Sequence, residues 1–428
     1  MIFRSFKLLS AALLTLLMVV ACGGGSSSPA PTGLTVTPGD GGATVTWDMV
    51  PGVDYWLFCA PTLSAPTDTL STQKWIGLCP AQKTVNGTLL TVNGVVVLDS
   101  MMSVTSPYVI PSGLVNGTSY SFTINGRVNS GPGGPGAPAV LATPRLAGAN
   151  WTAGTATGTT ALRGVAFGTV YVAAGDGGAM YSSADGATWS TINYATSTNL
   201  NGASFFGTYK LVGDSGLVLM SSDAITWTPQ TSKTTQNLYA IASNNVNLNV
   251  AVGANGTIIT SPDGVNWTAV ASPTTNSLYG ITYSAYNGGT WVAVGAAGTM
   301  VESPDGFAWH SVSSNTAADL RGVAYGASTS ATGATTFVAV GASGTMLSSA
   351  DGISWISRVP PVMIDLKAIT YGTRFVAVGA GGNIFISTDG STWTASSATG
   401  TTNDLNAVAR GTLAYLAVGN AGTNLLAR

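Results

Sequence analysis

A seven-residue motif that recurs six times constrains the fold more than any other feature of the chain. Its pattern is Ser-x-Asp-Gly-x-x-Trp, with Ala in place of Gly in one copy, and successive copies start 38 to 46 residues apart. Tandem units of this length bury their apolar faces against their neighbours. The motif therefore predicts a repeat array that fills the C-terminal part of the chain. Its copies are Ser183–Trp189, Ser221–Trp227, Ser261–Trp267, Ser303–Trp309, Ser349–Trp355 and Ser387–Trp393.

The composition favours short β-strands over helices. Charged residues make up 7% of the 428 residues and hydrophobic residues 45%, and 55 residues are glycine. Long surface helices need Glu and Lys, whereas short strands joined by polar turns suit Ser, Thr, Asn and Gly. The formal charge is −2 and becomes −4 if Arg4 and Lys7 are removed with a signal peptide. This charge predicts no nucleic-acid partner.

Residues 1–21 have the parts of an export signal. Arg4 and Lys7 precede an apolar run, Leu8–Ala21, which is too short to span a bilayer as a mature helix. The run ends in Val-Val-Ala-Cys, which resembles the lipobox of bacterial lipoproteins, in which the cysteine, here Cys22, becomes the lipidated first residue. By that resemblance Gly23 favours an outer-membrane lipoprotein that faces the periplasm or the cell surface. The alternative is an ordinary cleaved signal with a chance cysteine.

Residues 22–30 are rich in Gly, Ser and Pro and are predicted to be a flexible tether. Beyond Cys22 the chain has two cysteines, Cys59 and Cys79. An exported pair in one small domain most simply forms a disulfide, and two buried free thiols are the alternative. Two cysteines and one histidine do not make a metal cluster, so we expect no metal and no other cofactor.

Short segments of alternating polarity predict a two-sheet β-sandwich over residues 31–146. The segment Gly113–Phe122 resembles the fibronectin type III domain, in which a leucine, a tight turn and a tyrosine form the tyrosine corner. The resemblance implies that Trp47 is the core tryptophan of this domain. The stretch between Pro61 and Ser106 is longer than the family pattern, so it leaves the middle strands open.

Counting two recurring residues predicts a closed ring over residues 149–428. Seven leucines each begin a first strand, and the six motif tryptophans together with Trp151 also number seven. Since Trp151 precedes the first complete unit and the last unit lacks a tryptophan, the strand at Trp151 can complete the last unit. Seven four-stranded blades then close into a β-propeller with no exposed sheet edge. The predicted fold class is all-β, a sandwich followed by a seven-bladed propeller.

The first strand of each unit is predicted to lie nearest the axis. It carries small residues such as Gly164, Gly322 and Ala368, which suit the crowded centre where the blades converge. The tryptophan strand carries bulky residues and threonine, which suit the wide rim. Extra residues occur only between the first and second strands, mainly in the units that begin at Leu278 and Leu320, and we expect these turns on the same face as the motif.

The repeated Asp is predicted to be structural. Ser and Asp side chains can accept hydrogen bonds from nearby backbone N–H groups, Gly supplies a positive φ angle, and Trp packs between sheets. Six equivalent copies argue against catalysis at any one of them. The motif resembles the Asp-box (BNR) repeat of sialidases and of the photosystem II assembly factor, a seven-bladed lumenal propeller. The resemblance implies the fold and little about activity, because that box lies away from the sialidase active site.

A candidate binding ring comes from the residue immediately after each first-strand leucine. These seven positions hold Arg, Lys, Tyr and Asn, and they are expected near the mouth of the axial channel. We predict a polar, net-positive ring that accepts a carboxylate, a peptide C-terminus or a sugar. The alternatives are a solvated lining with no ligand and a binding face at the inserted turns. The ring consists of Arg163, Asn201, Tyr239, Tyr279, Arg321, Lys367 and Asn406.

The chain offers few of the residue combinations that known catalytic sites require. Glycosidases need a carboxylate pair, or a tyrosine with an acid partner, and Glu302 is the only glutamate of the chain. His310, the only histidine, follows Trp309 on an outer strand and is expected at the surface. The chain has no P-loop, dinucleotide fingerprint or zinc-ligand spacing. We therefore expect no enzymatic activity.

The sequence as a whole predicts a cell-envelope, lipid-anchored binding or scaffold protein. We expect a monomer whose propeller recognises a protein or peptide segment, or a glycan, and whose membrane contact is the N-terminal lipid alone. Two alternatives stay open. One is a carbohydrate-active, sialidase-like hydrolase with an unusual site, and the other is a structural or adhesive surface protein.

Overall fold

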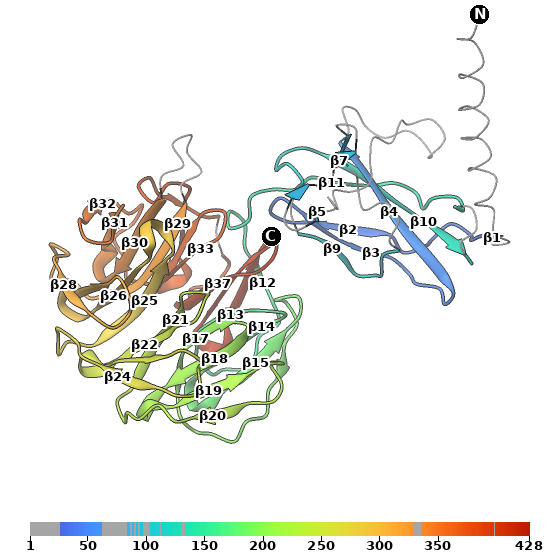
Figure 1. The fold of residues 1–428 in the computed structure, drawn as a ribbon. Coiled ribbons are helices and arrows are strands. Elements are labelled where there is room, and N and C mark those ends of the chain that lie inside the picture. Colours follow the sequence, from blue (N-terminus) through green and yellow to red (C-terminus); the bar gives the residue numbers. More distant parts are fainter. Residues whose placement is uncertain are drawn as a thin grey trace, which may run out of the picture. The chain divides into compact units, whose positions relative to one another are not determined.

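The computed structural model contains two compact units, Met1–Leu146 and Ala147–Arg428, and each is described by itself. All described elements are β-strands or three-residue 3-10 turns (Figure 1). No helix among the described residues is long and apolar enough to cross a membrane. The structure describes residues 26–61, 84–85, 88–89, 91–92, 95–96, 103–111, 113–129, 133–327, 335–397 and 399–428.

The first unit contains two sheets and two short hairpins. In one sheet β10 (Tyr120–Val128) pairs with β1 (Ser26–Ser27), β4 (Val53–Pro61) and β11 (Val140–Ala142). The other sheet has the order β2 (Thr35–Pro38), β3 (Ala43–Thr46), β9 (Tyr108–Ile110). The hairpins are β5 (Thr84–Val85) with β6 (Thr88–Leu89) and β7 (Thr91–Val92) with β8 (Val95–Val96).

The core of the first unit is aromatic. Trp47 and Tyr55 are buried with ring centroids 5.7 Å apart, and Phe122 is buried beside them. The hydroxyl of Tyr120 accepts a hydrogen bond of 3.0 Å from the backbone N–H of Val115. This bond joins the turn to the start of β10, which is the corner contact that the sequence predicts. The assignment of the unit to the fibronectin type III family stays a prediction.

The tether prediction for residues 22–30 is wrong in its second half. Ser26–Ser27 forms strand β1, which pairs with Arg127 and Val128 at the end of β10. On this edge β11 pairs only with the first three residues of β10, so β1 can satisfy peptide groups that β11 leaves unpaired. Ser28 is buried beside Gly126, where a Cβ atom would lie 2.3 Å from the Ser28 Oγ. The small side chains of Ser26, Ser27 and Ser28 therefore allow this segment to pack closely against β10.

Several predicted features lie outside the described residues. These are the signal segment 1–21, the lipidation residue Cys22 and the predicted disulfide partner Cys79. Cys59 lies in the buried core on β4 and is disulfide-bonded.

The second unit consists of seven four-stranded antiparallel sheets, here called blades 1 to 7, whose strands follow one another in sequence in blades 1 to 6 (Figure 1). The first strands are β13 (Leu162–Phe167), β17 (Leu200–Phe206), β21 (Leu238–Ser243), β25 (Leu278–Ser284), β29 (Leu320–Ala327), β33 (Leu366–Tyr371) and β37 (Leu405–Arg410). The second strands are β14 (Tyr171–Gly175), β18 (Thr208–Gly213), β22 (Asn249–Gly253), β26 (Thr290–Gly295), β30 (Thr335–Gly341), β34 (Phe375–Gly379) and β38 (Tyr415–Gly419).

The remaining strands complete each blade toward its rim. The third strands are β15 (Met180–Ser183), β19 (Val218–Ser221), β23 (Ile258–Ser261), β27 (Met300–Ser303), β31 (Met346–Ser349), β35 (Ile384–Ser387) and β39 (Asn424–Ala427). The fourth strands are β16 (Ser190–Thr191), β20 (Thr228–Gln230), β24 (Thr268–Val270), β28 (His310–Val312), β32 (Ile356–Arg358) and β36 (Thr394–Ala395), and in blade 7 the fourth strand is β12 (Thr152–Ala153).

The closing strand is the one that the tryptophan count predicts. β12 pairs antiparallel with β39, so that Thr152 lies opposite Leu426 and Ala153 opposite Leu425. Trp151, only 6% exposed, packs in a core cluster with residues of blades 6 and 7. Its indole N–H donates to the carbonyl oxygen of Gly148 at 2.9 Å. The predicted seven-sheet architecture with a terminal closing strand is thereby confirmed.

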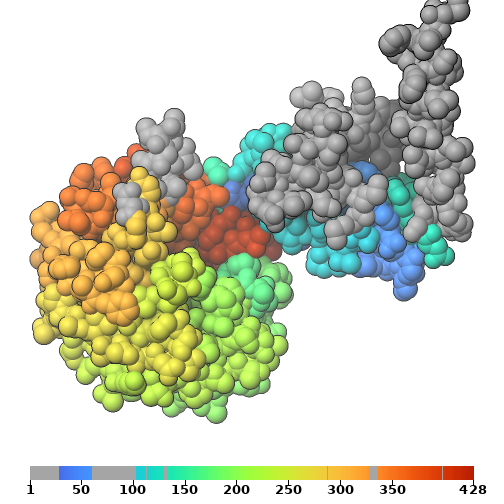
Figure 2. All heavy atoms as spheres, viewed as in Figure 1, coloured from blue at the N-terminus to red at the C-terminus, as the bar shows by residue number. Residues whose placement is uncertain are grey.

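The apolar core of this unit lies between consecutive blades. Val172 and Met180 of blade 1 pack against Leu211 of blade 2, and every following pair of blades shares a similar cluster. The last such cluster joins Leu162 of blade 1 to Leu416 of blade 7, so the circle of contacts is complete. In Figure 2 the coloured atoms of successive blades form a continuous surface.

The first strands form the inner ring, as their small residues predict. Each packs against the first strands of its two neighbours, including β13 against β37. A Cβ atom on Gly164 would lie 3.0 Å from the carbonyl carbon of Gly202, and one on Gly202 would lie 2.7 Å from the carbonyl oxygen of Tyr239. Larger side chains at these points would push neighbouring backbones apart.

Each Asp-box motif is a self-contained hydrogen-bonded turn. In the copy Ser261–Trp267, Asp263 Oδ1 accepts the N–H groups of Val265 and Asn266, both at 2.8 Å. The hydroxyl of Ser261 donates to the same oxygen at 2.9 Å and accepts the Gly264 N–H at 2.8 Å. The indole N–H of Trp267 closes the turn on the Gly264 carbonyl at 3.0 Å. Every bond is local, which supports the structural interpretation of the motif.

These bonds lower the pKa of all six motif carboxyl groups. For Asp223, N–H donors from Thr226 and Ile225 lower the pKa to about 2. Backbone donors likewise lower the pKa of Asp263 and Asp305. At the other three, burial is the largest single cause and raises the pKa, but the backbone and side-chain donors together outweigh it, and the pKa values of Asp185, Asp351 and Asp389 fall below the ordinary value.

Replacing Trp151 by alanine tests the closing strand. Trp151→Ala is expected to lower the free energy of unfolding by about 3–5 kcal/mol, because it leaves a cavity between blades 6 and 7 beside the closing strand. Denaturant unfolding measures the effect, with Phe307→Ala as the control because that aromatic side chain is 56% exposed. If the two variants lost the same small amount of stability, the seam would not depend on Trp151.

The Asp-box carboxylates predict a loss of stability in acid. A carboxyl group with a lowered native pKa stabilises the fold above its unfolded pKa, near 3.8, and that contribution is lost as the pH falls through the native value. Asp223→Asn should therefore melt below the wild type at pH 7, and the gap should close as the pH approaches about 2. Melting curves between pH 7 and pH 2 measure the gap, with the exposed Asp54→Asn as control. A gap that is independent of pH would contradict the assignment.

Candidate functional site

A β-bulge at the start of every inner strand positions the predicted ring. In each blade the pairing register shifts between the first-strand leucine and the residue two positions later. The leucine is fully buried, and the residue after it is the extra, unpaired residue of the bulge. A bulge redirects the side chain of its extra residue, so one residue per blade is freed from sheet packing. These residues are Arg163, Asn201, Tyr239, Tyr279, Arg321, Lys367 and Asn406.

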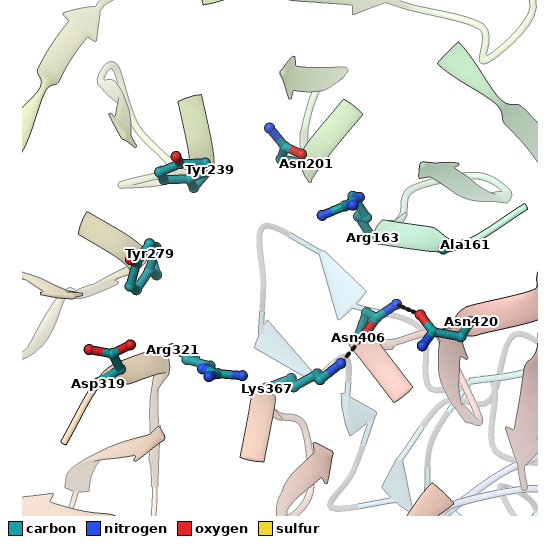
Figure 3. Close-up of a pocket in the computed structure, with 10 residues that line it drawn as sticks. All are labelled: Ala161, Arg163, Asn201, Tyr239, Tyr279, Asp319, Arg321, Lys367, Asn406 and Asn420. Atoms are coloured by element: carbon teal, nitrogen blue, oxygen red, sulfur yellow. Dashed lines mark hydrogen bonds between the residues drawn. The ribbon is translucent and has the colours of Figure 1, made fainter. Parts of the chain in front are cut away.

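The structure brings all seven predicted ring residues around one cavity at the channel mouth. The cavity has a volume of about 460 Å³ and is also lined by Ala161, Asp319 and Asn420. Figure 3 shows the side chains arranged around a common central space. We call this space the mouth cavity.

Hydrogen bonds across the junctions between blades hold one side of the mouth cavity. Lys367 Nζ donates to Asp404 Oδ2 at 2.8 Å and to Asn406 Oδ1 at 2.9 Å, both in blade 7. The Asn406 amide donates in turn to the Leu162 carbonyl of blade 1 and to Asn420 Oδ1, both at 2.9 Å (Figure 3). This chain of bonds spans two junctions and restricts the rotamers of its members.

The remaining cations of the mouth cavity are also paired with aspartates. Arg163 forms an ion pair with Asp176 in the turn of its own blade, and Arg321 lies 3.4 Å from Asp365 of the next blade. The hydrogen bond from Lys367 is the main cause that lowers the pKa of Asp404. The prediction of a net-positive ring is therefore wrong, because each cation brings an acidic partner.

The opposite side of the mouth cavity is aromatic and acidic. The Tyr239 and Tyr279 rings have centroids 5.5 Å apart and an interplanar angle of 54°. In Figure 3 Asp319 lies next to Tyr279. Asn201 donates its amide hydrogens to Asp214 Oδ1 at 2.8 Å and to the Leu238 carbonyl at 3.0 Å. Its own carbonyl oxygen is thereby left as an acceptor.

Residues that precede the first-strand leucines clip neighbouring blades together around the mouth. Asp319 Oδ1 accepts the N–H of Ala297, which belongs to the 3-10 turn η5 (Ala296–Gly298) of the preceding blade, at 2.9 Å. The equivalent bonds, all of 2.9 Å, join Gly177 to Asn199, Ser215 to Asn237, Ser343 to Asp365 and Gly381 to Asp404. These bonds connect successive blades around the mouth cavity and restrain the backbone that lines it. We call them the frame of the mouth.

The predicted ring did not include these acidic positions. The signal was present, since Asp319, Asp365 and Asp404 each stand directly before a first-strand leucine. The position looked like an ordinary turn residue because its contacts lie in other blades. Asp176 and Asp214 begin the 3-10 turns η1 (Asp176–Gly178) and η2 (Asp214–Gly216), and both also contact ring residues.

The other candidate groups lie away from the mouth cavity. Glu302 and His310 face each other on β27 and β28, the third and fourth strands of blade 4, with Nδ1 and Oε1 3.3 Å apart and His310 64% exposed. Of the two inserted turns, the one in blade 4 contains the 3-10 turn η4 (Tyr286–Gly288), and the one in blade 5 includes residues 328–334, which lie outside the described part. Among the described residues no group of three or more His, Cys, Asp or Glu is placed to hold a metal ion.

Comparison with known proteins identifies the fold alone. No family model matches the chain, and a search of curated proteins finds no match. Among solved structures, YCF48 bound to D1 peptide is similar with a TM-score of 0.53 and 17% identity, over 64% of this chain and 94% of that one.

Two further solved structures have a similar fold. YCF48 from Cyanidioschyzon merolae gives a TM-score of 0.51 and 15% identity, over 64% of this chain and 98% of that one. The WD40 β-propeller domain of Doa1 gives a TM-score of 0.51 and 12% identity, over 66% of this chain and 97% of that one. The chain thus contains a β-propeller that resembles those of YCF48 and of WD40 proteins.

Proposed function

We propose that this chain is a binding protein whose propeller recognises a segment of another protein at the mouth cavity. The observation that carries the proposal is the convergence of seven bulge side chains, one from each blade, on a single cavity. A residue released from sheet pairing is free to serve a ligand, and bulges are frequent beside functional sites. YCF48, a propeller of similar fold, has been solved with a D1 peptide bound, which supports a peptide as the ligand class.

The chemistry of the mouth cavity suits a peptide. Its volume of about 460 Å³ falls within the range of about 300–1,000 Å³ of ligand pockets, enough for a few residues. The cavity offers N–H donors from Arg163 and Arg321, an acceptor from Asn201 and aromatic surface from two tyrosines. A peptide presents carbonyl acceptors, amide donors and side chains at close spacing, so it can use all three. The frame of interblade hydrogen bonds lowers the entropic cost of binding.

We propose that this binding is not coupled to catalysis. The Glu302–His310 pair lies on outer strands, whereas the mouth cavity is built from inner strands and their turns. The Asp-box carboxylates are held by their own turns. Hydrolase activity toward glycans is the rival, and assays of sialoside and glycoside turnover test it directly.

The proposal includes export, a lipid anchor at Cys22 and an outer-membrane location. Its support is the lipobox Val19–Cys22 and the basic, apolar start of the chain. We further propose that residues 31–146 form a fibronectin type III spacer, supported by the hydrogen bond of Tyr120 to the Val115 N–H.

Cys22→Ser tests the anchor. The variant is expected to leave the membrane fraction, while Ser26→Ala is expected to stay in it. Fractionation of the native host and mass spectrometry of the mature N-terminal peptide measure the result. A wild-type N-terminus at another residue, or one with an unmodified cysteine, would contradict the proposal.

Peptide binding at the mouth cavity is testable without knowing the partner. A random peptide library is displayed on phage and selected on the purified protein, and the enriched peptides are measured by calorimetry. Asn201→Trp is expected to weaken them at least ~10-fold, because an indole would fill part of the cavity and a well-placed interface group contributes at least ~1.4 kcal/mol.

Ile225→Trp is the matched control, since Ile225 is 75% exposed within an Asp-box turn away from the mouth. Peptides that bound wild type and Asn201→Trp equally, but lost affinity for Ile225→Trp, would place the binding face at the Asp boxes instead.

A further inference from the structure

The mouth cavity has two chemically different sides. The polar side contains Arg163, Arg321 and Lys367, and the other contains Tyr239 and Tyr279 with Asp319, which we call the aromatic subsite. In Figure 3 the two tyrosines lie next to each other and Asp319 stands at the edge of Tyr279. If the mouth cavity binds a protein segment, as proposed above, the chemistry of this subsite determines which side chain of the segment it accepts.

The balance of charge around the mouth favours a cationic ligand group. Three cations are accompanied by five carboxylates, and Asp176, Asp365 and Asp404 are each paired with one cation. The two others are Asp214, which neutral Asn199 and Asn201 hold, and Asp319. A negatively charged ligand would have to compete with carboxylates that already occupy the cations.

Asp319 is the acidic residue lining the mouth cavity that forms no ion pair within the described residues, although Arg321 stands beside it (Figure 3). Its Oδ1 accepts the Ala297 N–H, and within the described residues its Oδ2 has no hydrogen-bond donor. Asp319 lines the cavity, whereas Asp214 does not. One carboxylate oxygen is therefore available to a ligand, from a residue whose orientation the neighbouring blade already fixes.

The tyrosine pair supplies the second requirement of a cation site. A guanidinium or ammonium group is attracted to the face of an aromatic ring within about 6 Å of its centre. The two rings are tilted by 54°, so they present differently oriented surfaces along one wall of the cavity. A carboxylate beside an aromatic wall binds a basic side chain through both charge and ring face.

We propose that the aromatic subsite takes a basic side chain, Arg or Lys, of the bound protein segment, with its charge on Asp319 and its stem along Tyr239 and Tyr279. Across the cavity, Arg163 pairs with Asp176 through Nε, so its Nη groups are directed to the ligand backbone. Arg321, which stands beside Asp319 in Figure 3, contacts Asp365 through one Nη only, so its guanidinium keeps further donors for the ligand. Backbone carbonyls of the segment are the acceptors that these donors suit. One side of the cavity thus binds a positively charged side chain, and the other side binds backbone carbonyl groups of the same segment.

Citrulline tests this inference, because it keeps the shape of arginine and removes the charge. Peptides selected on wild type are expected to share a basic residue. Replacing that residue by citrulline, or lysine by its acetylated form, should weaken binding about tenfold. Asp319→Asn should weaken the basic peptide by a similar factor and should bind the basic and neutral peptides alike. The asparagine oxygen can still accept the Ala297 N–H, so the frame is retained.

Asp54→Asn is the control, since it removes an exposed carboxylate outside the propeller, and it should change affinity less than twofold. If peptides bind and Asn201→Trp blocks them, but citrulline leaves their affinity unchanged, the basic-side-chain inference is overturned while peptide binding stands. If no peptide of the library binds at the mouth, the proposed function fails, and the inference fails with it.

Discussion

Packing between neighbouring blades is the interaction on which the whole propeller depends. No sheet of this unit has a core of its own, because its apolar faces are covered only by the sheets before and after it. The arrangement is stable only if the last sheet also meets the first. Burial at that junction is deep enough to raise the pKa of Tyr171 to about 12. Because β12 and Trp151 complete blade 7, the sheet that must meet both blade 6 and blade 1, they are a condition for the fold rather than a terminal detail.

The same packing explains why the candidate site lies at the axis. Inner strands of neighbouring blades approach most closely two residues after each leucine, where every blade has glycine or alanine. The bulge after each leucine interrupts this constraint at one position per blade. Since that side chain no longer serves the core, it can vary without cost to the fold. Seven positions that are equivalent in structure therefore hold four kinds of residue, whereas the buried leucines beside them do not vary.

Rigidity and recognition are combined at the mouth. The acidic residues that clip one blade to the next also pair with the cations of the ring, so a single carboxylate can hold a backbone N–H with one oxygen and a side chain with the other. Asp404 does both, and Asp365 does the same for Ser343 and Arg321. A ligand thus meets groups that are already ordered, and Asp319 is the member of this set whose second oxygen faces the cavity.

The sequence alone determined the architecture of the second unit, because spacing and residue size are local properties. The recurrence of leucine and tryptophan set the number of sheets, the orphan Trp151 set the closing strand, and small residues set the inner strands. It also located the seven ring positions. The charge of the ring was decided only by the tertiary structure, since Asp365 and Asp404 reach their cations from the next blade. Strand β1 likewise depends on an edge of β10 that residues 22–30 do not reveal. Contacts between distant segments depend on the pairing register of the strands and on the positions of bulges. The residue pattern of a single strand does not specify either of them.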